Sequence, residues 1–427
     1  MGITRRAIIV GIAAAGLCCA GPSPRRDPQA PPLPTDLLAG LPFQVRSPRP
    51  PDWRQLAKPV PSLDRARRWG PLRDLRHADL SRADLKGRSR ELLDAFFDSR
   101  TLWPGDLPPG FDPAGILEAN RDPGLGLRAL HERGITGTGV AAAIIDTPLL
   151  LDHEEYADRL VFYDEINAWG EANFHGTLVA SILAGRTCGV APGATVFYLG
   201  CHNYRVHKER MVPDVRAYAA ALEEILELNR RLPSERRIRV VSISAGWGPA
   251  VPGFRTMNRT VRRATAAGIF VVSANMFGAP GGGFWFWGLD RPATDDPNDP
   301  AVYRALPWRD WIGEVAVEES FPALYKRRLG RSRPPEFLLV PEGPKTVAHP
   351  HGRAEYGFYR RGGWSSVCPY IAGLYALACQ VKPEITPGEF WRASLATGKW
   401  SPAPKDAESF SGRIVDPVRL VESLKRP

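Results

Sequence analysis

The sequence predicts an α/β protein in which helices flank a doubly wound, mostly parallel sheet, with an N-terminal extension before it. The apolar run from Val140 to Ile145 is continuous and ends at Asp146, which is typical of a strand buried on both faces. Segments with helix and strand periodicity then alternate, as expected for a parallel sheet. In order, we expect a helix at His175–Ala184, a strand at Ala194–Leu199, a helix at Val215–Leu232, a strand at Ile238–Ile243, a helix at Arg255–Ala267 and a strand at Ile269–Val272.

The rest of the chain has a weaker pattern. A helix is expected at Ser89–Phe97, and strands are expected at Glu314–Val317 and Phe337–Val340. A further helix is expected near Pro387–Ala396. Composition divides the chain into a signal peptide at 1–20, a disordered Pro/Arg-rich tether at 21–52, an extension at 53–133, the α/β domain at 134–400 and a C-terminal tail at 401–427. The extension is either a pro-segment or a fixed part of the core.

The N-terminus has the features of an export signal. Arg5-Arg6 precedes the apolar stretch Ala7–Ala20, which is short for a membrane span. The arginine pair fits the twin-arginine pattern loosely, and Cys18 or Cys19 is a candidate for lipidation. We therefore expect a secreted, periplasmic or cell-envelope protein that touches a membrane only through a lipid anchor. The sequence leaves the twin-arginine, general and lipoprotein export routes open.

Charge and cysteine content limit the other partners. The net charge is +10, but arginines are spread along the chain without a long basic run, so we expect no nucleic-acid site. The four cysteines after the signal match no zinc spacing; they are Cys188, Cys201, Cys368 and Cys379. Export permits a disulfide between Cys188 and Cys201. An equally good interpretation is that the cysteines are buried free thiols that pack as small apolar residues.

Three chemically suggestive residues occupy distinctive positions. Asp146 ends the buried strand, His175 opens a helix, and Ser365 begins a helix within Gly363–Gly373. A hydroxyl, an imidazole that takes its proton and a carboxylate that orients the imidazole together make a nucleophilic site. Taken singly, the same residues could be a turn or capping Asp, a core His and a capping Ser. Their order along the chain, Asp, His and then Ser, is the order of subtilisin.

The local motifs resemble those of the subtilisin-like serine proteases, known as subtilases or peptidase family S8. The resemblance covers roughly residues 134–398 and lies in four motifs: Gly137–Thr147, His175–Ile182, Gly189–Ala194 and Gly363–Gly373. It implies a subtilisin-like fold, with Ser365 as nucleophile, His175 as base and Asp146 as orienting carboxylate. The alternative nucleophile Ser366 would place the motif's proline at the wrong spacing.

The resemblance also implies the rest of a protease site. Asn275 and the Ser365 backbone N–H would form the oxyanion hole, and Ser244-Ala245-Gly246 would pair with an extended substrate. The sequence departs from the family at three positions, with Trp364 for Thr, Ser366 for Met and Ala274 for Gly. Trp364 could thereby narrow the cleft.

The sequence thus predicts an exported, monomeric serine endopeptidase whose partner is a polypeptide substrate. Two alternatives remain: an inactive homologue that binds peptides or acts as a scaffold, and an esterase or amidase with the same triad. We expect no required cofactor and no metal at the catalytic site. The acidic loop Asp290–Asp299 could hold calcium, as in some relatives, but its spacing is not that of an EF-hand and favours a solvated turn.

Overall fold

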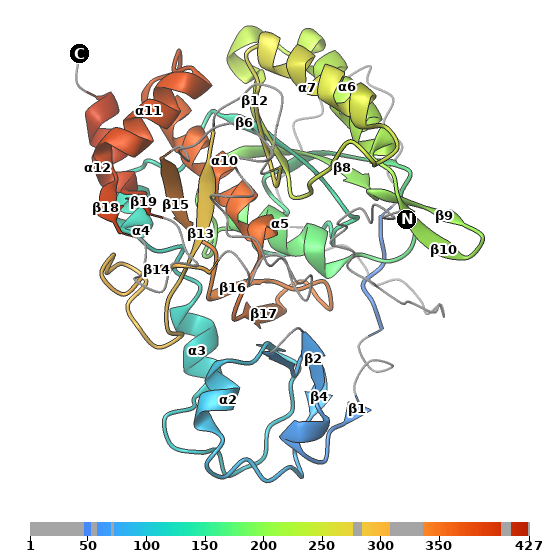
Figure 1. The fold of residues 1–427 in the computed structure, drawn as a ribbon, viewed down its shortest axis with the longest axis vertical. Coiled ribbons are helices and arrows are strands. Elements are labelled where there is room, and N and C mark those ends of the chain that lie inside the picture. The colour runs from blue at the N-terminus through green and yellow to red at the C-terminus, as the bar shows by residue number, and fades with distance from the viewer. Residues whose placement is uncertain are drawn as a thin grey trace, which may run out of the picture.

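The computed structural model describes residues 47–52, 58–69, 72–275, 284–307, 336–402 and 411–425. Its centre is a five-stranded, all-parallel sheet with the strand order β12-β11-β6-β8-β7 (Figure 1). The bounds are β6 Ala141–Asp146, β7 Leu160–Ile166, β8 Thr195–Cys201, β11 Ile238–Ile243 and β12 Phe270–Ser273. Helices cover both faces of this sheet, which confirms the predicted fold class.

The apolar run of β6 explains why both faces are covered. Successive side chains of a strand point to opposite faces. Ala142 and Ile144 belong to one core cluster, whereas Ala141, Ala143 and Ile145 belong to another. The first cluster includes residues of α5 (Phe174–Ala184) and α10 (Trp364–Val381), and the second includes residues of α6 (Arg216–Arg231) and α7 (Phe254–Ala266). Figure 1 shows α6 and α7 together on the side of the sheet away from α5.

A second five-stranded sheet, in the order β14-β13-β15-β19-β18, packs beside the first. Its bounds are β13 Phe286–Asp290, β14 Arg304–Ala305, β15 Phe337–Pro341, β18 Lys399–Ser401 and β19 Gly412–Ile414. Helix α10 contacts both sheets, and α11 (Pro387–Thr397) and α12 (Pro417–Leu424) cover this end of the molecule. The predicted strand at 337–340 and helix near 387–396 are confirmed.

The predicted boundary of a C-terminal tail at 401 is wrong. Strand β19 pairs with β15, and helix α12 buries Leu420 and Val421 in the core cluster. A sequence signal for α12 was available, because Asp416 caps the Arg419 N–H and Pro417 takes the first helical position. Residues 412–424 are therefore part of the α/β domain.

The N-terminal extension has its own small core. Its buried side chains include Leu63, Leu80, Leu92 and Phe97, and Phe358 of the α/β domain joins the same cluster. Strand β5 (Phe97–Asp98) pairs with β17 (Tyr356–Tyr359) of that domain. The predicted helix at 89–97 is too long, because α2 covers only Ser89–Leu93 and Phe97 lies in β5.

The remaining elements are short. They are β1 Lys58–Pro59, η1 Leu63–Arg65, β2 Arg67–Trp69, β3 Leu72–Asp74, β4 Ala78–Asp79, α3 Pro113–Ala119, α4 Leu127–Glu132, β9 Tyr204–His207, β10 Arg210–Pro213, η2 Ser234–Arg236 and β16 Lys345–Ala348. The helix α4 and the long helices α6 and α7 lie at opposite sides of the molecule in Figure 1.

Several predictions fall at or beyond the limits of the described residues. The signal peptide at 1–20 and the strand at 314–317 lie outside them. The end of the predicted disordered tether needs correction, because Pro48 is buried and the Arg49 carbonyl accepts a hydrogen bond from the Ala172 N–H at 2.8 Å. No helix in the described ranges is long and apolar enough to cross a bilayer.

Candidate active site

A histidine and an aspartate meet at the carboxyl end of the central sheet. His175 Nδ1 lies 2.6 Å from Asp146 Oδ1, and the two side chains are 12% and 1% exposed. Asp146 is the last residue of β6, and His175 is the second residue of α5, whose N-cap Asn173 accepts from the His175 N–H at 2.8 Å. The same Asp146 oxygen also accepts from the Thr147 N–H at 2.7 Å. The carboxylate is thus held to face the imidazole.

The next residue, Gly176, allows this close approach. A Cβ at Gly176 would lie 2.1 Å from the Thr147 carbonyl oxygen and 2.5 Å from the Tyr198 hydroxyl, so a larger residue cannot fit without movement. The Gly176 N–H donates to Thr147 Oγ1 at 3.0 Å, and the Tyr198 hydroxyl donates to the Thr147 carbonyl at 2.6 Å. Helix α5 is thereby attached to the loop that follows Asp146.

The environment of His175 changes its acidity. Burial lowers its pKa, but the charge of Asp146 and their hydrogen bond raise it, and the net result is a raised pKa. An imidazole paired in this way is a stronger base and becomes a stabilised imidazolium when it takes a proton.

Ser365 occupies the first turn of α10, where backbone N–H groups have no acceptor within the helix. The N-cap Gly363 has φ 64° and ψ 179°, a backbone conformation that L-residues other than glycine rarely adopt. The glycine therefore permits the sharp entry into the helix two residues before the serine.

Pro369 lies in the second turn of α10. Its missing N–H would have bonded the carbonyl four residues earlier, which is that of Ser365. Ser244 Oγ donates to this carbonyl at 2.9 Å, and Ser365 Oγ donates to the Ser244 carbonyl at 3.3 Å. The proline thus frees the Ser365 carbonyl, and the segment after β11 binds it.

The two residues beside Ser365 are buried, and both side chains make contacts within the protein. Ser366 is 1% exposed, and its hydroxyl donates to the carbonyls of Glu342 and Gly363 at 2.8 and 2.9 Å. Trp364 is 5% exposed and packs edge-on against Trp287, with ring centroids 5.1 Å apart. The expectation that Trp364 narrows the cleft is therefore wrong, since this side chain belongs to the core.

The predicted substrate and oxyanion segments lie beside one another. Ser244 and Ala245 are buried, whereas Gly246 is exposed. Of the three residues predicted to pair with an extended substrate, only Gly246 is therefore exposed. Asn275 follows β12, and its Oδ1 accepts from the Trp247 N–H at 3.1 Å. This contact fixes the amide plane, and no hydrogen bond among the described residues engages Asn275 Nδ2.

Two further expectations concern cysteines and calcium. Cys188, Cys201, Cys368 and Cys379 are all buried free thiols, so the proposed Cys188–Cys201 disulfide is wrong. In the acidic loop, Asp290 pairs with Arg360, while Asp296 and Asp299 accept backbone N–H groups two residues further on. These carboxylates are used within the protein's own turns and ion pairs.

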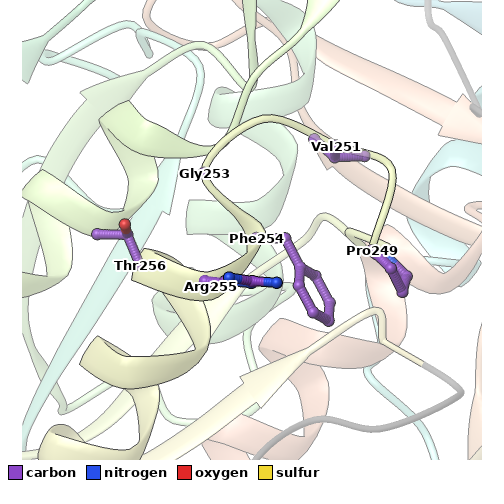
Figure 2. Close-up of a pocket in the computed structure, with 6 residues that line it drawn as sticks. All are labelled: Pro249, Val251, Gly253, Phe254, Arg255 and Thr256. Carbon is purple, nitrogen blue, oxygen red and sulfur yellow. The ribbon is translucent and has the colours of Figure 1, made fainter.

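A shallow surface pocket lies on the connection between β11 and α7, downstream of Gly246 (Figure 2). Its lining residues are Pro249, Val251, Gly253, Phe254, Arg255 and Thr256. None of the three candidate catalytic side chains is among them.

Comparison with known proteins identifies the family. The profile of the Subtilase family, Peptidase_S8, matches residues 137–399, more than half of the 427 residues. This chain belongs to the subtilase family. The family match begins after the N-terminal extension and includes Asp146, His175 and Ser365.

Individual relatives are more distant. The Subtilisin-like protease PopC of Myxococcus xanthus is 25% identical over 288 residues, which are 61% of this chain and 56% of PopC. The Extracellular serine proteinase of a Thermus species is 32% identical over 143 residues, which are 33% of this chain and 31% of the relative. The chain thus matches about half or less of the length of these relatives. The solved structure of the prenylagaramide maturation protease PagA covers 70% of this chain and 98% of its own at 17% identity, with a TM-score of 0.47.

Proposed function

We propose that this subtilase is an exported serine endopeptidase that uses Ser365, His175 and Asp146 as a catalytic triad. The observation that carries the proposal is the 2.6 Å contact between His175 Nδ1 and Asp146 Oδ1, made at the carboxyl end of the parallel sheet. The functional residues of such sheets gather at this end. The serine lies on a neighbouring helix whose first turn is held by Ser244, in the segment that follows β11.

The proposed chemistry follows the roles of the three groups. Ser365 Oγ attacks the scissile carbonyl while His175 takes its proton, and Asp146 stabilises the resulting imidazolium. His175 then gives the proton to the leaving amine, which leaves an acyl group on Ser365, and water removes this group by the same route. The Ser365 hydroxyl now donates to the Ser244 carbonyl, so it must rotate toward His175 before attack.

The oxyanion would be held by backbone and side-chain donors. The Ser365 N–H lies at the N-terminus of α10, where the helix dipole favours negative charge. Asn275 Nδ2 is the second donor that we propose, because Trp247 binds the oxygen of the same amide and fixes its orientation. Donors that are already oriented stabilise the developing charge without reorganisation.

The test is hydrolysis of casein by the purified full chain. Ser365→Ala, His175→Ala and Asp146→Ala should each remove most of the turnover, and the losses should not add because the groups act together. Ser366→Ala is the matched control and should keep its turnover per folded molecule, since its hydroxyl is buried against Glu342. Undiminished turnover in Ser365→Ala would reject the assignment. Cleavage of small esters alone would favour the esterase alternative, and absence of both activities would favour the scaffold.

Export is a separate part of the proposal. It is supported by Arg5-Arg6 before the apolar stretch 7–20, and one relative bears the name of an extracellular enzyme. Mass spectrometry of secreted protein should find a mature N-terminus between Cys18 and Arg26. Lipid on Cys18 or Cys19 would identify an anchored form, and an intact Met1 in the cytoplasm would contradict export.

A further inference from the structure

Three histidines and one aspartate meet where the N-terminal extension joins the α/β domain. His77 lies between β3 and β4, Asp98 ends β5, and His349 and His351 follow β16. One potential ligand atom from each of the four lies within 4.8 Å of the others. The rings of His77 and His351 have centroids 4.0 Å apart, and those of His349 and His351 are 4.4 Å apart.

One ring nitrogen of this cluster has no hydrogen-bond partner among the described residues. His351 Nδ1 is buried and unbonded there, whereas His77 Nδ1 and Asp98 Oδ2 pair with each other at 2.6 Å. Asp98 and His351 are 2% and 7% exposed. By contrast, Asp98 Oδ1 accepts from the N–H groups of His77 and Arg100 and from Thr101 Oγ1. Leaving a buried polar group unsatisfied is unfavourable, so His351 Nδ1, whose ring lies 4.0 Å from that of the paired His77, calls for a ligand.

The charges around the cluster are compatible with a bound cation. Two arginines lie close by, but Arg76 is paired with Asp74, and Arg100 is paired with Glu355 at 2.6 Å. The neighbouring His153 is not available, since its Nε2 contacts the Glu355 carbonyl and its Nδ1 accepts from the Glu155 N–H.

We propose that His77, Asp98, His349 and His351 form a four-coordinate site for a divalent transition-metal ion, with zinc as the ion. Three imidazole nitrogens and one carboxylate oxygen suit zinc, whereas calcium and magnesium prefer oxygen ligands. Ligands about 2.0–2.2 Å from a tetrahedral zinc lie about 3.4 Å apart. The four donor atoms already lie within 4.8 Å, so side-chain movements on the order of 1 Å complete the site.

The position of the site indicates its role. His77 and Asp98 belong to the extension, whereas His349 and His351 lie within the stretch that matches the subtilase family. A shared ion would therefore hold the two parts together, beside the pairing of β5 with β17. The extension would then be a fixed part of the mature protein and not a removable pro-segment.

The same attachment reaches the catalytic helix. Arg76, next to His77, places its guanidinium 5.0 Å from the ring centroid of Phe174, which begins α5 beside His175. Arg76 also donates to the Tyr359 hydroxyl at 2.7 Å. Loss of the ion would loosen the segment that packs behind the first turn of α5. The metal site is independent of the proposed peptidase activity, because its test measures binding and not turnover.

The experiment uses the full chain with Ser365→Ala, which prevents self-cleavage, after removal of metal with a chelator. Titration with zinc against a chromophoric chelator should give one equivalent per chain with a Kd below micromolar, and cobalt should give the visible absorption of a four-coordinate site. His349→Asn and His351→Asn should each weaken binding by more than about 100-fold, since loss of an outer-sphere partner alone costs about 10–100-fold. The matched control is His131→Asn, whose Nε2 contacts the Val190 carbonyl outside the cluster, and it should still bind one equivalent.

Two measurements on the unaltered cluster keep the test decisive if a variant fails to fold. Saturating zinc should raise the Tm of the metal-free chain by about 4 °C or more. Hydrogen exchange should show that the amides of β5 lose protection when zinc is removed. No zinc binding tighter than about 10 µM would overturn the proposal, as would equal zinc affinity in His351→Asn.

Discussion

Replacing Gly176 with alanine tests whether helix packing positions the catalytic histidine. The new Cβ would lie 2.1 Å from the Thr147 carbonyl, whereas ordinary contacts begin at 3.4 Å, so the start of α5 must move by about 1 Å. The same movement would lengthen the 2.6 Å contact between His175 and Asp146 beyond hydrogen-bond range. We expect kcat to fall by about 10²–10⁴. The lower limit is the effect of a misplacement of about 1 Å, and the upper limit is the effect of losing the orienting carboxylate.

Stability distinguishes this explanation from a general effect of alanine. In a helix without the close contact, Gly→Ala would stabilise the fold by about 0.5–1 kcal/mol. Overpacking against Thr147 costs about 1–3 kcal/mol, so we expect the Tm to fall. Gly105→Ala is the matched control, because no heavy atom lies within 4 Å of its Cβ position and it lies outside the catalytic region.

The assay is kcat on a peptide substrate, normalised to folded protein, in a double-mutant cycle. If Gly176 acts through the Asp146–His175 pair, Gly176→Ala should cost little further activity in an Asp146→Ala background. A kcat within threefold of wild type, or a raised Tm, would refute the packing argument. Fully additive losses would show that Gly176 acts by another route.

Two further predictions concern the same site. Asn275→Ala should lower kcat by about 10²–10³ with KM nearly unchanged, and a kcat within threefold of wild type would place the second oxyanion donor elsewhere. The raised pKa of His175 predicts that kcat/KM rises with pH through a pKa above the ordinary 6.5, because only the neutral imidazole is a base. Asp146→Asn should move that transition to lower pH in a pH–rate profile, and an unchanged transition would contradict the pairing.

The central sheet was predictable because its strands carry strong local signals. Every residue of β6 is buried, so the strand appears in the sequence as an unbroken apolar run. Strand β7 was missed because it is at the edge of the sheet, and its last three residues, Asp164 to Ile166, are only half-buried. The helix predicted at 89–97 was too long because a short apolar run fits a helix or a strand, and pairing with β17 decides for a strand at Phe97.

The residues of the candidate site could be proposed from the sequence, but their geometry could not. The motifs around Asp146, His175 and Ser365 could be recognised together, from their order along the chain, whereas the roles of Gly176 and Ser244 depend on contacts between distant segments. The histidine cluster gave no sequence signal beyond the pair at 349 and 351, because its other members lie about 250 residues away in the extension. Residues that meet through long-range tertiary contacts have no fixed spacing along the sequence, so no sequence motif reveals them.

The most direct test of the proposed triad is labelling with a fluorophosphonate, read by intact mass and peptide mapping. Fluorophosphonates react with a serine only when a neighbouring base activates it. The proposed triad should give one adduct per chain, located on Ser365, that is absent in Ser365→Ala and strongly reduced in His175→Ala. An adduct on Ser366 or another serine would contradict the assignment of the nucleophile. Absence of any adduct on the folded chain would contradict a working triad.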